Sequence, residues 1–412
     1  MSEPEPTDFD PGLATFTEAA EAISAVVHRT PVESSASLSR LTGGQVWLKA
    51  ENLQRAGSFK IRGAYLRMSR LGTEQRRLGV VAASAGNHAQ GVALAARELG
   101  ISAKVFMPLG AALPKLDATR QYGAEVVQAG GNLTEALEAA HAEAAGTGRV
   151  LIHPYDHADI VTGQGTLGLE ILQQVPDART IIVPTGGGGL LAGVAAAAHA
   201  VDPDITVVGV QAAGAATYPR SLAEGRPVPW AAVDTMADGI AVGVPGDVPF
   251  SVIRRHAIHV RTVGESELSR AVLYVAERAK MVVEPSGAAG VAALLGDPDA
   301  FPGPVVVLLS GGNVDPLILL RIVRHGMSAS GRYLEMRVRV RDSPGSLAAL
   351  LQDLAGDGAN VLSVEHIRTY AELAVDEVEI SVELEAQGPD HCDSVLQMLH
   401  DRGYHVVGSR AG

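Results

Sequence analysis

Lys60 is the side chain with the clearest capacity for covalent chemistry in this sequence. It follows the turn Gly57-Ser58-Phe59 and opens an apolar, helix-like run in the stretch ENLQRAGSFKIRGAY. A lysine is normally a solvated surface group, but a lysine amine that is partly removed from water becomes a nucleophile that forms Schiff bases. The polar, glycine-containing turn before Lys60 therefore predicts an amine with a role in catalysis.

Three further segments share one design, in which a strand runs into a sharp turn and then into the start of a helix. They are VVAASAGNHAQGVALAA, TIIVPTGGGGLLAGVAAA and VVVLLSGGNVDPLILL. Ligands of parallel α/β sheets bind beyond the carboxyl ends of the strands, where such turns meet. The N–H groups of four consecutive glycines can surround an oxyanion, and the helix that follows adds a favourable dipole. A flexible linker is the alternative, but the strand and helix that directly flank the glycines favour an anion site.

Two other patterns with chemical potential have simpler explanations. The segment GQGTLG, 163–168, matches the dinucleotide-binding fingerprint, but its lead-in HADIVT is a poor strand and no acidic residue stands about twenty residues later. His153, His157 and Asp159 could ligate a metal, but a loop after a strand explains the segment HPYDHAD more simply. We therefore expect neither a Rossmann nucleotide site nor a bound metal.

The composition predicts a soluble, cytoplasmic chain of two or three domains. The chain has 412 residues, of which 47% are hydrophobic and 19% charged. Its net charge of −13, without a Lys/Arg block, argues against nucleic acid or an anionic membrane as the main partner. Cys392 is the single cysteine, so no intrachain disulfide forms. The acidic start MSEPEPTDFDPG is unlike a secretory signal, and no apolar run has membrane-spanning length.

Short apolar runs alternate with Ala-rich amphipathic helices over most of the chain. We expect residues 1–12 to be disordered and a first helix from Thr15 to His28. The predicted strands are QVWLKA, RLGVVAAS, SAKVFMP, AEVVQAG, RVLIHP, TIIVPT, ITVVGVQ, HAIHV and PVVVLLS. This alternation predicts parallel α/β sheets covered by helices. We expect residues 13–325 to form two lobes, with a smaller lobe of about 50–154 inserted in a larger one.

The pattern changes near the C-terminus. The small, polar segment GMSASGR, 326–332, predicts a linker. In residues 333–412, YLEMRVRV and VDEVEISVELEA alternate apolar and polar residues, and SLAALLQDLAGDG and DHCDSVLQMLHDRG are amphipathic. With NVLSVEHIRT and YHVVGS these segments give the order β-α-β-β-α-β, which predicts a separate domain on the split-βαβ, ferredoxin-like plan.

Six motifs carry a resemblance to a known family. GSFKIRGAY, SAGNHAQG, GQGT, PTGGGGL, EPSGAAG and LSGGN, in this order, resemble the serine/threonine dehydratases (threonine ammonia-lyases) of the tryptophan-synthase-β-like, fold-type II pyridoxal-phosphate enzymes. The C-terminal segment RDSPGSLAALLQDLAGDGANVLSVEH resembles an ACT domain, a small-ligand regulatory module. The resemblance implies pyridoxal 5′-phosphate as cofactor. It also implies conversion of L-threonine to 2-oxobutanoate and ammonia, with L-serine to pyruvate as a side reaction.

The resemblance also assigns roles to individual residues. Lys60 is expected to form the Schiff base with the cofactor and then to remove the substrate Cα proton, and Ser310 is expected to face the pyridine nitrogen. The implied catalytic residues are Lys60, Ser84 and Glu284. The implied cofactor-binding residues are Phe59, Lys60, Asn87, Gly186, Gly187, Gly188, Gly189, Leu190 and Ser310. The substrate carboxylate is assigned to Ser84, Ala85, Gly86, Asn87 and His88. The turn between the first strand and first helix of the C-terminal segment is expected to bind the regulatory ligand through Asp342, Pro344, Gly345 and Ser346, with Asn360 contributing if two such domains pair edge to edge.

Departures from related families narrow the activity. Ala85 stands where eukaryotic-type serine racemases carry a second serine, which protonates the opposite face of the substrate. Gln211, Ala215 and Thr217 stand where the same racemases carry divalent-metal carboxylates. Both differences disfavour a racemase and a metal site. The sequence Lys60-Ile61-Arg62 also differs from the K-D-R that is common in cysteine and threonine synthases.

Two alternatives remain open at this stage. The first is a dedicated serine dehydratase or racemase, since threonine and serine differ by one methyl group, worth only about 1–3 kcal/mol in a pocket. The second is a non-catalytic amino-acid sensor that binds pyridoxal phosphate. We expect isoleucine or valine as the effector, because isoleucine is made downstream of 2-oxobutanoate. We expect a homodimer or homotetramer, because exposed sheet edges of such domains tend to pair.

Overall fold

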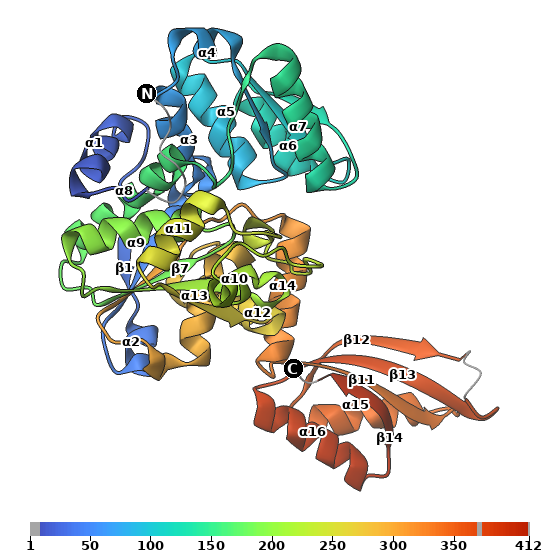
Figure 1. Ribbon diagram of the computed structural model, residues 1–412. Coiled ribbons are helices and arrows are strands. Elements are labelled where there is room, and N and C mark those ends of the chain that lie inside the picture. The colour runs from blue at the N-terminus through green and yellow to red at the C-terminus, as the bar shows by residue number, and fades with distance from the viewer. Residues whose placement is uncertain (1–8, 369–372, 411–412) are drawn as a thin grey trace. The chain divides into compact units, whose positions relative to one another are not determined.

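The structure is a computed structural model that describes residues 9–368 and 373–410. The chain divides into two compact units, Met1–Pro316 and Leu317–Gly412 (Figure 1). Within the described residues, no helix combines the length and apolar character needed to cross a membrane. The first unit carries the glycine- and serine-containing turns and consists of two α/β lobes, whereas the described part of the second is an antiparallel sheet with three helices.

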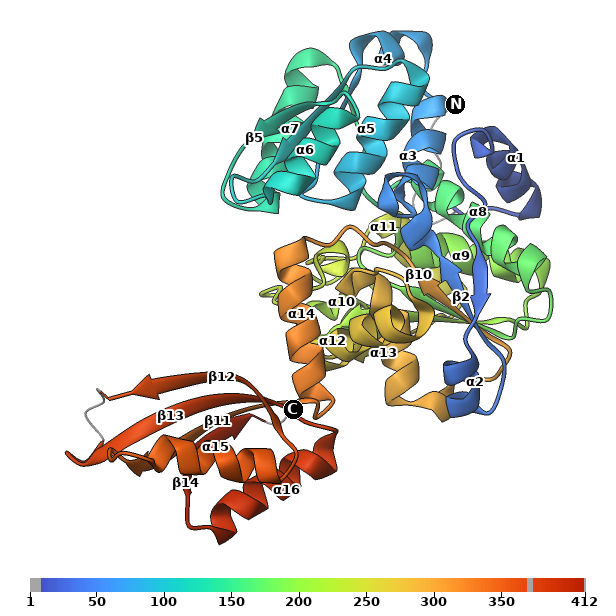
Figure 2. The same ribbon diagram turned by 180° about the vertical axis from the view of Figure 1, so that it is seen from behind.

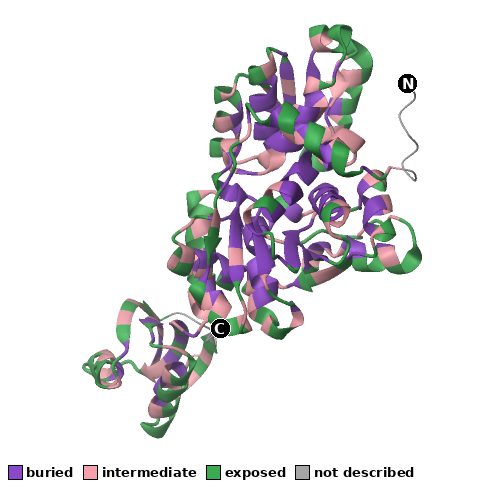
Figure 3. Ribbon diagram, turned by 90° about the vertical axis from the view of Figure 1, so that its left-hand side faces the viewer, coloured by how far each residue is buried: buried purple, intermediate pink, exposed green. Residues whose placement is uncertain are grey.

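The larger lobe is built on a six-stranded sheet in the order β1-β2-β10-β7-β8-β9. Its strands are β1 (Val32–Ser34), β2 (Val46–Ala50), β7 (Thr180–Pro184), β8 (Thr206–Ala212), β9 (His259–Val263) and β10 (Val305–Leu309). All pairs are parallel except β1 with β2. One face is covered by α8 (Ala158–Gln174), α9 (Gly189–Val201) and α11 (Asp247–Arg255), and the other by α12 (Glu265–Tyr274) and α13 (Pro285–Gly296) (Figures 1 and 2). The near-continuous apolar runs of the central strands follow from this double cover (Figure 3).

The smaller lobe has a parallel sheet in the order β5-β4-β3-β6. Its strands are β3 (Val80–Ala83), β4 (Ala103–Met107), β5 (Glu125–Gln128) and β6 (Val150–Leu151). Val80 and Ala82 face the helices α3 (Lys60–Ser69), α5 (Asn87–Leu99) and α6 (Leu113–Gln121). Val81 and Ala83 face α7 (Leu133–Thr147). The short helix α4 (Thr73–Leu78) precedes β3. Every predicted strand is present in one of these two sheets, and the two-lobed α/β fold is confirmed.

The second unit follows the predicted β-α-β-β-α-β order. Its elements are β11 (Tyr333–Arg341), α15 (Ser346–Gly356), β12 (Asn360–Ile367), β13 (Glu377–Glu385), α16 (Pro389–Asp401) and β14 (His405–Arg410), after α14 (Pro316–Ala329). The sheet order β12-β13-β11-β14 is antiparallel throughout. Alternate residues of β11 and β13 pack with both helices in one apolar core. The ferredoxin-like plan is therefore confirmed.

The predicted linker at 326–332 is wrong for most of its length. Helix α14 continues to Ala329, and the Ser330 hydroxyl donates to the Gly326 carbonyl at 2.7 Å. The chain turns at Gly331, whose φ is +67°, a backbone conformation that glycine adopts without strain. Small residues are compatible with a helix whose preceding turns are strongly amphipathic, so the composition of the segment did not mark a break.

The N-terminal predictions also need correction. The first helix, α1, runs Leu13–Ile23 and ends earlier than expected. Of the segment predicted to be disordered, residues 1–8 lie outside the described residues. In the remainder, Phe9 packs against the core of the larger lobe, and Asp10 pairs with Arg255 at 3.4 Å and with His256 at 3.2 Å. These contacts, made with a helix more than two hundred residues away, order the segment, and no local pattern reveals them.

The segment GQGTLG lies inside α8, where its glycines permit close packing of helices. A Cβ at Gly163 would lie 2.6 Å from the Cα of Gly63 on α3, and one at Gly165 would lie 2.8 Å from the carbonyl oxygen of Gly193 on α9. The glycines therefore bring three helix backbones together. This packing explains the spacing that matched a dinucleotide fingerprint without a nucleotide site.

We expect Gly193→Ala to destabilise the first unit. The new Cβ would lie 2.3 Å from the carbonyl oxygen of Val161 and 2.6 Å from the nitrogen of Gly165, and backbone atoms cannot move aside cheaply. Overpacking of this kind costs about 1–3 kcal/mol. Urea unfolding should show this loss for Gly193→Ala. The control Gly146→Ala, on an exposed helical position with no atom within 4 Å, should gain about 0.5–1 kcal/mol. Equal stability of the two variants would contradict the packing argument.

Candidate active site

A cavity of about 350 Å³ lies where the predicted turns of the first unit meet. Helix α3 begins at Lys60, α5 at Asn87 and α9 at Gly189, and Ser310 directly follows β10. All four of these residues line the cavity. Because the strands before these turns are parallel within their sheets, their carboxyl ends open toward the same space, as the sequence analysis expected.

Lys60 presents a partly desolvated amine to this cavity. Its Nζ donates to the carbonyl oxygen of Pro154 at 3.0 Å and lies 5.1 Å from the ring centroid of Phe59. Burial lowers the pKa of Lys60 to about 8, against the opposing effect of the Glu284 charge. On its other side, a Cβ at Gly91 would lie 3.1 Å from the Lys60 Cβ, so α5 approaches α3 closely at this point. The geometry supplies an amine that loses its proton more easily than an exposed lysine.

The four-glycine loop has little room for side chains, because a Cβ at Gly187 or Gly188 would clash with a tyrosine and one at Gly186 or Gly189 would be crowded. Gly188 has φ +99°, and a Cβ there would lie 1.8 Å from the Tyr218 hydroxyl oxygen. A Cβ at Gly187 would fall 2.4 Å from the ring of Tyr155. The Tyr218 hydroxyl also donates to the Gly187 carbonyl at 3.2 Å. The loop thereby forms a cradle at the start of α9, where the first N–H groups of a helix have no partner inside it.

Glu284 and two asparagines form a hydrogen-bonded group at the cavity wall. The Asn87 amide donates to Glu284 Oε1 at 2.6 Å, and the Asn313 amide donates to Asn87 Oδ1 at 2.9 Å. Burial raises the pKa of Glu284 to about 7, although the Asn87 hydrogen bond opposes this rise. A Cβ at Gly311 would lie 2.4 Å from Glu284 Oε1, so the LSGGN turn also closes on this carboxyl. Glu284 can therefore hold or release a proton near neutral pH.

The predicted carboxylate loop, residues 84–88, lines the cavity, but its side chains differ in role. The Ser84 hydroxyl accepts a hydrogen bond from the Gly86 N–H at 3.1 Å. The His88 ring is buried and contacts the carbonyl oxygen of Ile152 at 2.8 Å, inside the smaller lobe. Burial lowers the pKa of His88 to about 3, so the ring is neutral. His88 can thus contribute its backbone N–H to an anion, but not a charged side chain.

Phe59, Leu190 and Ser310 also take positions consistent with the expectation. All three line the cavity, and the Phe59 N–H donates to the Ser310 carbonyl at 3.2 Å. Ser310 is 4% exposed, and the adjoining Gly311 forms a bridge with Ser58. These contacts join the turn before Lys60 to the end of the central strand β10.

Several residues of the cavity have no role in the sequence analysis. Lys115 of α6 and Asp238 of the 3-10 turn η4 (Asp238–Ile240) form an ion pair at 3.0 Å, and both line the cavity. Tyr155 packs beside the glycine loop, and the Ser286 hydroxyl accepts from the Gly239 N–H at 2.7 Å. Ser286 lies in the EPSGAAG motif but had no assigned role, and none of the six motifs contains Lys115, Asp238 or Tyr155. Their position depends on how segments distant in sequence fold together.

The predicted regulatory residues lie in the second unit and divide into two places. Asp342, Pro344, Gly345 and Ser346 form the turn between β11 and α15, and Asp342 pairs with Arg368 at 3.2 Å. Asn360 pairs with Glu385 across β12 and β13, whereas Arg341, next to the turn, pairs with Glu377. Glu377 and Glu385 are the two ends of β13. Within one chain, Asn360 is therefore at the opposite end of the sheet from the turn and cannot share a ligand with it.

Comparisons with known proteins agree with this geometry. A family model described as pyridoxal-phosphate dependent enzyme matches residues 23–311, and the chain belongs to this family. The L-threonine ammonia-lyase of Thermotoga maritima is 43% identical over 394 residues, which cover 96% of this chain and 98% of the relative. The structure of maize serine racemase is 37% identical with a TM-score of 0.73, covering 76% of this chain and 97% of that one. Threonine deaminase isoform 2 of Solanum lycopersicum is 35% identical with a TM-score of 0.73, covering 76% and 87%.

The residues present fit pyridoxal phosphate, the cofactor of this family. The cradle at Gly186–Gly189, whose backbone lies at the start of α9, suits a phosphate group. The Lys60 amine, with its lowered pKa, suits a cofactor that carries an aldehyde, and the Phe59 ring beside it offers an aromatic face. The Asn87 amide and the Ser310 hydroxyl line the same cavity and can bond to polar atoms of the pyridine ring.

We expect Glu284→Gln to change the pH dependence of stability in the cofactor-free chain. The folded protein holds the Glu284 proton up to about pH 7, whereas the unfolded chain releases it near its ordinary pKa of 4.5. Unfolding therefore becomes easier as pH rises between these values, by up to about 3 kcal/mol at 1.4 kcal/mol per pKa unit. Glu284→Gln keeps an acceptor for Asn87 and removes this contribution. In urea titrations, the free energy of unfolding of the variant should rise relative to that of the wild type from pH 5 to 7.5. Parallel curves of this free energy against pH would contradict the prediction.

Proposed function

We propose that the protein removes water and then ammonia from L-threonine to give 2-oxobutanoate, with L-serine to pyruvate as a slower reaction. The observation that carries this proposal is the Lys60 amine, whose pKa burial lowers to about 8, in one cavity with the glycine cradle and the 84–88 loop. The name of the Thermotoga maritima relative, which aligns with 96% of the chain, supports threonine as the substrate.

Lys60 has the properties of the base in such a reaction. Bound pyridoxal phosphate supplies an electron sink that acidifies the Cα proton of an attached amino acid. A pKa of about 8, against 10.5 for an ordinary lysine, makes the neutral amine about two orders of magnitude more abundant near pH 7. The hydrogen bond to the Pro154 carbonyl holds Nζ at the cavity wall. The neutral amine can then take the Cα proton.

Other residues of the cavity can orient the substrate and stabilise its charged groups. The loop at residues 84–88 leads into the N-terminus of α5, where backbone N–H groups favour a carboxylate. Glu284 can hold a proton at its carboxyl near pH 7, with Oε1 fixed by Asn87. Ser310 offers a neutral hydroxyl where a carboxylate would supply full charge, which suits elimination of a β-hydroxyl better than transamination.

A serine dehydratase or racemase is the second candidate function. The similarity to maize serine racemase supports this candidate. Ala85 lines the cavity and carries no group that could protonate the face of the substrate opposite Lys60. This absence at position 85 supports dehydration over racemisation. A non-catalytic sensor is a weaker alternative, because Lys60, Ser84 and Ser310 are all present and line one cavity.

We expect Lys60→Ala to abolish release of 2-oxo acid from L-threonine and L-serine, because it removes the base and the covalent attachment of the cofactor. The control is Lys104→Ala, which removes a lysine that pairs with Glu143 outside the cavity. Steady-state assays should find full loss of turnover for the first variant and near wild-type turnover for the second.

We expect incubation of the wild type with L-serine, followed by chiral chromatography, to yield pyruvate and little D-serine. D-serine formation at a comparable rate would contradict the proposed activity.

We also propose that residues 333–412 form an ACT-type regulatory domain that binds isoleucine or valine and assembles the protein as a dimer or tetramer. The turn between β11 and α15 supports this, because Gly345 has φ +95° and precedes the free N–H groups of α15. The strand β12 is at an edge of its sheet, where a second chain can pair. The placement of Asn360 limits the ligand site to this turn unless a second chain supplies the asparagine.

We expect Gly345→Val to weaken the effect of isoleucine or valine on the threonine dependence of full-length protein. A β-branched residue is strained at positive φ and would distort the turn. Gly403→Val is the matched control, since Gly403 has φ +80° in the same domain but lies before β14. Calorimetric titration should show that isoleucine or valine binds the wild type and the control. The free energy that couples this binding to threonine binding should be about 1–3 kcal/mol. If neither amino acid binds the wild type, the domain acts only in assembly.

A further inference from the structure

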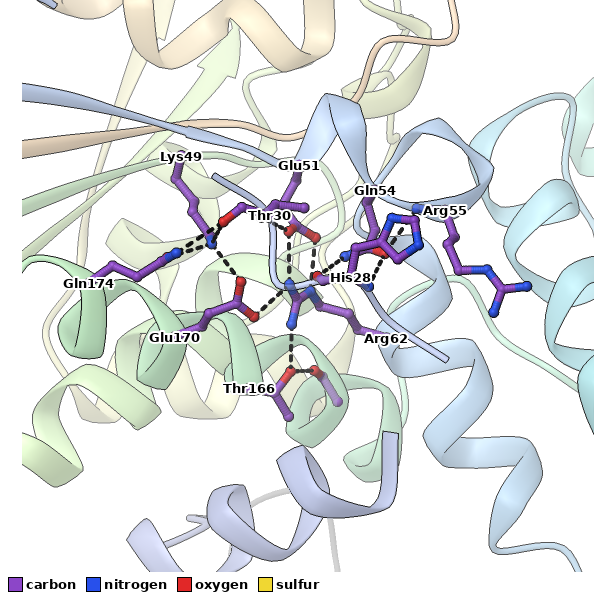
Figure 4. A network of polar contacts seen from close by, with 11 residues as sticks. His28, Thr30, Lys49, Glu51, Gln54, Arg55, Arg62, Thr166, Glu170 and Gln174 are labelled. Atoms are coloured by element: carbon purple, nitrogen blue, oxygen red, sulfur yellow. Dashed lines mark hydrogen bonds and ion pairs between the residues drawn. The ribbon is translucent and has the colours of Figure 1, made fainter. Parts of the chain in front are cut away.

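Four charged side chains are buried together next to the active site. They form the Arg62 network, which consists of Lys49, Glu51, Arg62 and Glu170 (Figure 4). The exposed fractions of these side chains are 0%, 0%, 1% and 12% in that order. None of them lines the cavity, and the proposed reaction uses none of them. Two cations and two carboxylates balance in charge, so the network has no net charge to place near the site.

Arg62 is the centre of the network. Its Nε and Nη2 donate to the two oxygens of Glu51, each at 2.8 Å, and Nη2 also donates to Glu170 Oε2 at 2.9 Å. Burial alone would raise the pKa of Glu51, but the charge and hydrogen bonds of Arg62 hold it below its usual value. Two parallel hydrogen bonds from a planar guanidinium fix its orientation relative to the carboxylate, which a lysine ammonium does not do.

Lys49, which lies on strand β2, completes the network. Its Nζ donates to Glu170 Oε1 at 2.6 Å, to the Thr30 carbonyl at 2.7 Å and to Gln174 Oε1 at 2.7 Å. The Thr30 hydroxyl donates to Glu51 Oε1 at 2.6 Å. The network thereby connects β2, the turn after it, α3 and α8, as Figure 4 shows.

Stability by itself is a poor explanation for this arrangement. The cost of removing charges from water often exceeds their mutual attraction, and apolar side chains of similar volume can replace a buried ion pair at no loss of stability. What a forked ion pair supplies is a defined direction for the elements that it joins.

The forked ion pair of Arg62 acts on the first turn of α3. Arg62 follows Lys60 by two residues, and its N–H donates to the carbonyl of Phe59 at 3.0 Å. The same strand that carries Lys49 pairs in register with β10, with Lys49 opposite Leu308, and β10 leads to Ser310. The network thus connects the turn that carries Lys60 with the strand that leads to Ser310.

We infer that Arg62 is a positioning residue, which through Glu51 and Glu170 fixes the first turn of α3 and thereby the direction of the Lys60 side chain in the cavity. This inference rests on the proposed role of Lys60 as the cofactor-bearing base, but not on the identity of the substrate. Loss of the fork leaves the turn free to shift and admits water to the amine. Lys60 then becomes a weaker base at neutral pH and is misplaced relative to the substrate.

The test compares Arg62→Lys with Arg67→Lys. Both substitutions keep the charge and remove the planar guanidinium. Both residues lie on α3 and pair with a carboxylate of α8, since Arg67 contacts Asp159 at 3.3 Å and Arg62 contacts Glu170 at 2.9 Å. In the cofactor-free chain, acetylation of Lys60 is followed against pH by mass spectrometry. In the holoenzyme, the visible absorbance of the bound cofactor is followed against pH. For Arg62→Lys, the Lys60 labelling midpoint should move up from about 8 toward 10.5 and the absorbance transition should shift. We expect kcat to fall by about ten- to a hundredfold, as a displacement of about 1 Å can cause, with KM changing less.

Arg67→Lys should leave the labelling midpoint, the absorbance transition and kcat near the wild-type values. If Arg62→Lys lowers thermal stability but leaves all three unchanged, or if both variants change them equally, the network serves only to dock α3 on α8 and the inference fails. If Arg62→Lys does not fold, Glu170→Gln tests the same inference, because it keeps the Glu51 pair and removes the charge of the second carboxylate that Arg62 contacts. A wild-type chain that releases no 2-oxo acid from any substrate would refute the proposed function and leave the labelling result intact.

Discussion

The desolvation of one lysine amine is the constraint on which the catalytic unit depends. An ammonium group loses hydration when it is buried, so its pKa falls, and Lys60 reaches about 8 in this way. The same burial would favour movement of the side chain toward solvent unless the surrounding backbone held it in place. The Pro154 carbonyl, the close approach of α5 at Gly91 and the turn closed by Ser310 all act at this point. An amine of useful basicity therefore requires contributions from both lobes.

Close backbone contact is the second constraint, and the composition provides for it. Aromatic residues are only 4% of the chain, so volume in the core comes from aliphatic side chains and from helices that lie near one another. Glycines at the contacts of α3, α8 and α9 remove the side chains that would keep the helices apart. Gly187, Gly188 and Gly189 likewise allow Tyr155 and Tyr218 to lie against the loop that lines the cavity. Packing and binding therefore use one property of glycine, its lack of a Cβ.

The charges around the cavity are arranged so that few are free near neutral pH. His88 is neutral because burial lowers its pKa, and Glu284 is only partly ionised because burial raises its pKa. The fixed charges of Arg62 and Glu51 balance one another outside the cavity. A carboxylate ligand therefore meets backbone N–H groups at the start of α5 rather than a charged histidine.

The sequence by itself determined the secondary structure and the local form of the site. Strands such as TIIVPT and PVVVLLS and the turns that follow them were predictable, because hydrophobic periodicity and glycine runs act over a few neighbouring residues. The same local signals placed Lys60 at a helix start and the glycines at a helix N-terminus. They also misjudged 326–332, where small polar residues continue a helix.

Tertiary structure decided which distant groups meet. The direction of the His88 ring, the Lys115–Asp238 ion pair and the Tyr155 contact depend on the order of strands in two sheets, which no local pattern encodes. The same holds for Asn360, which antiparallel register places at the far end of its sheet from Gly345. The Arg62 network joins residues up to 121 positions apart. Burial, and with it the pKa of Lys60 and of Glu284, exists only once such segments pack together, because desolvation is a property of the folded surroundings and not of the residue.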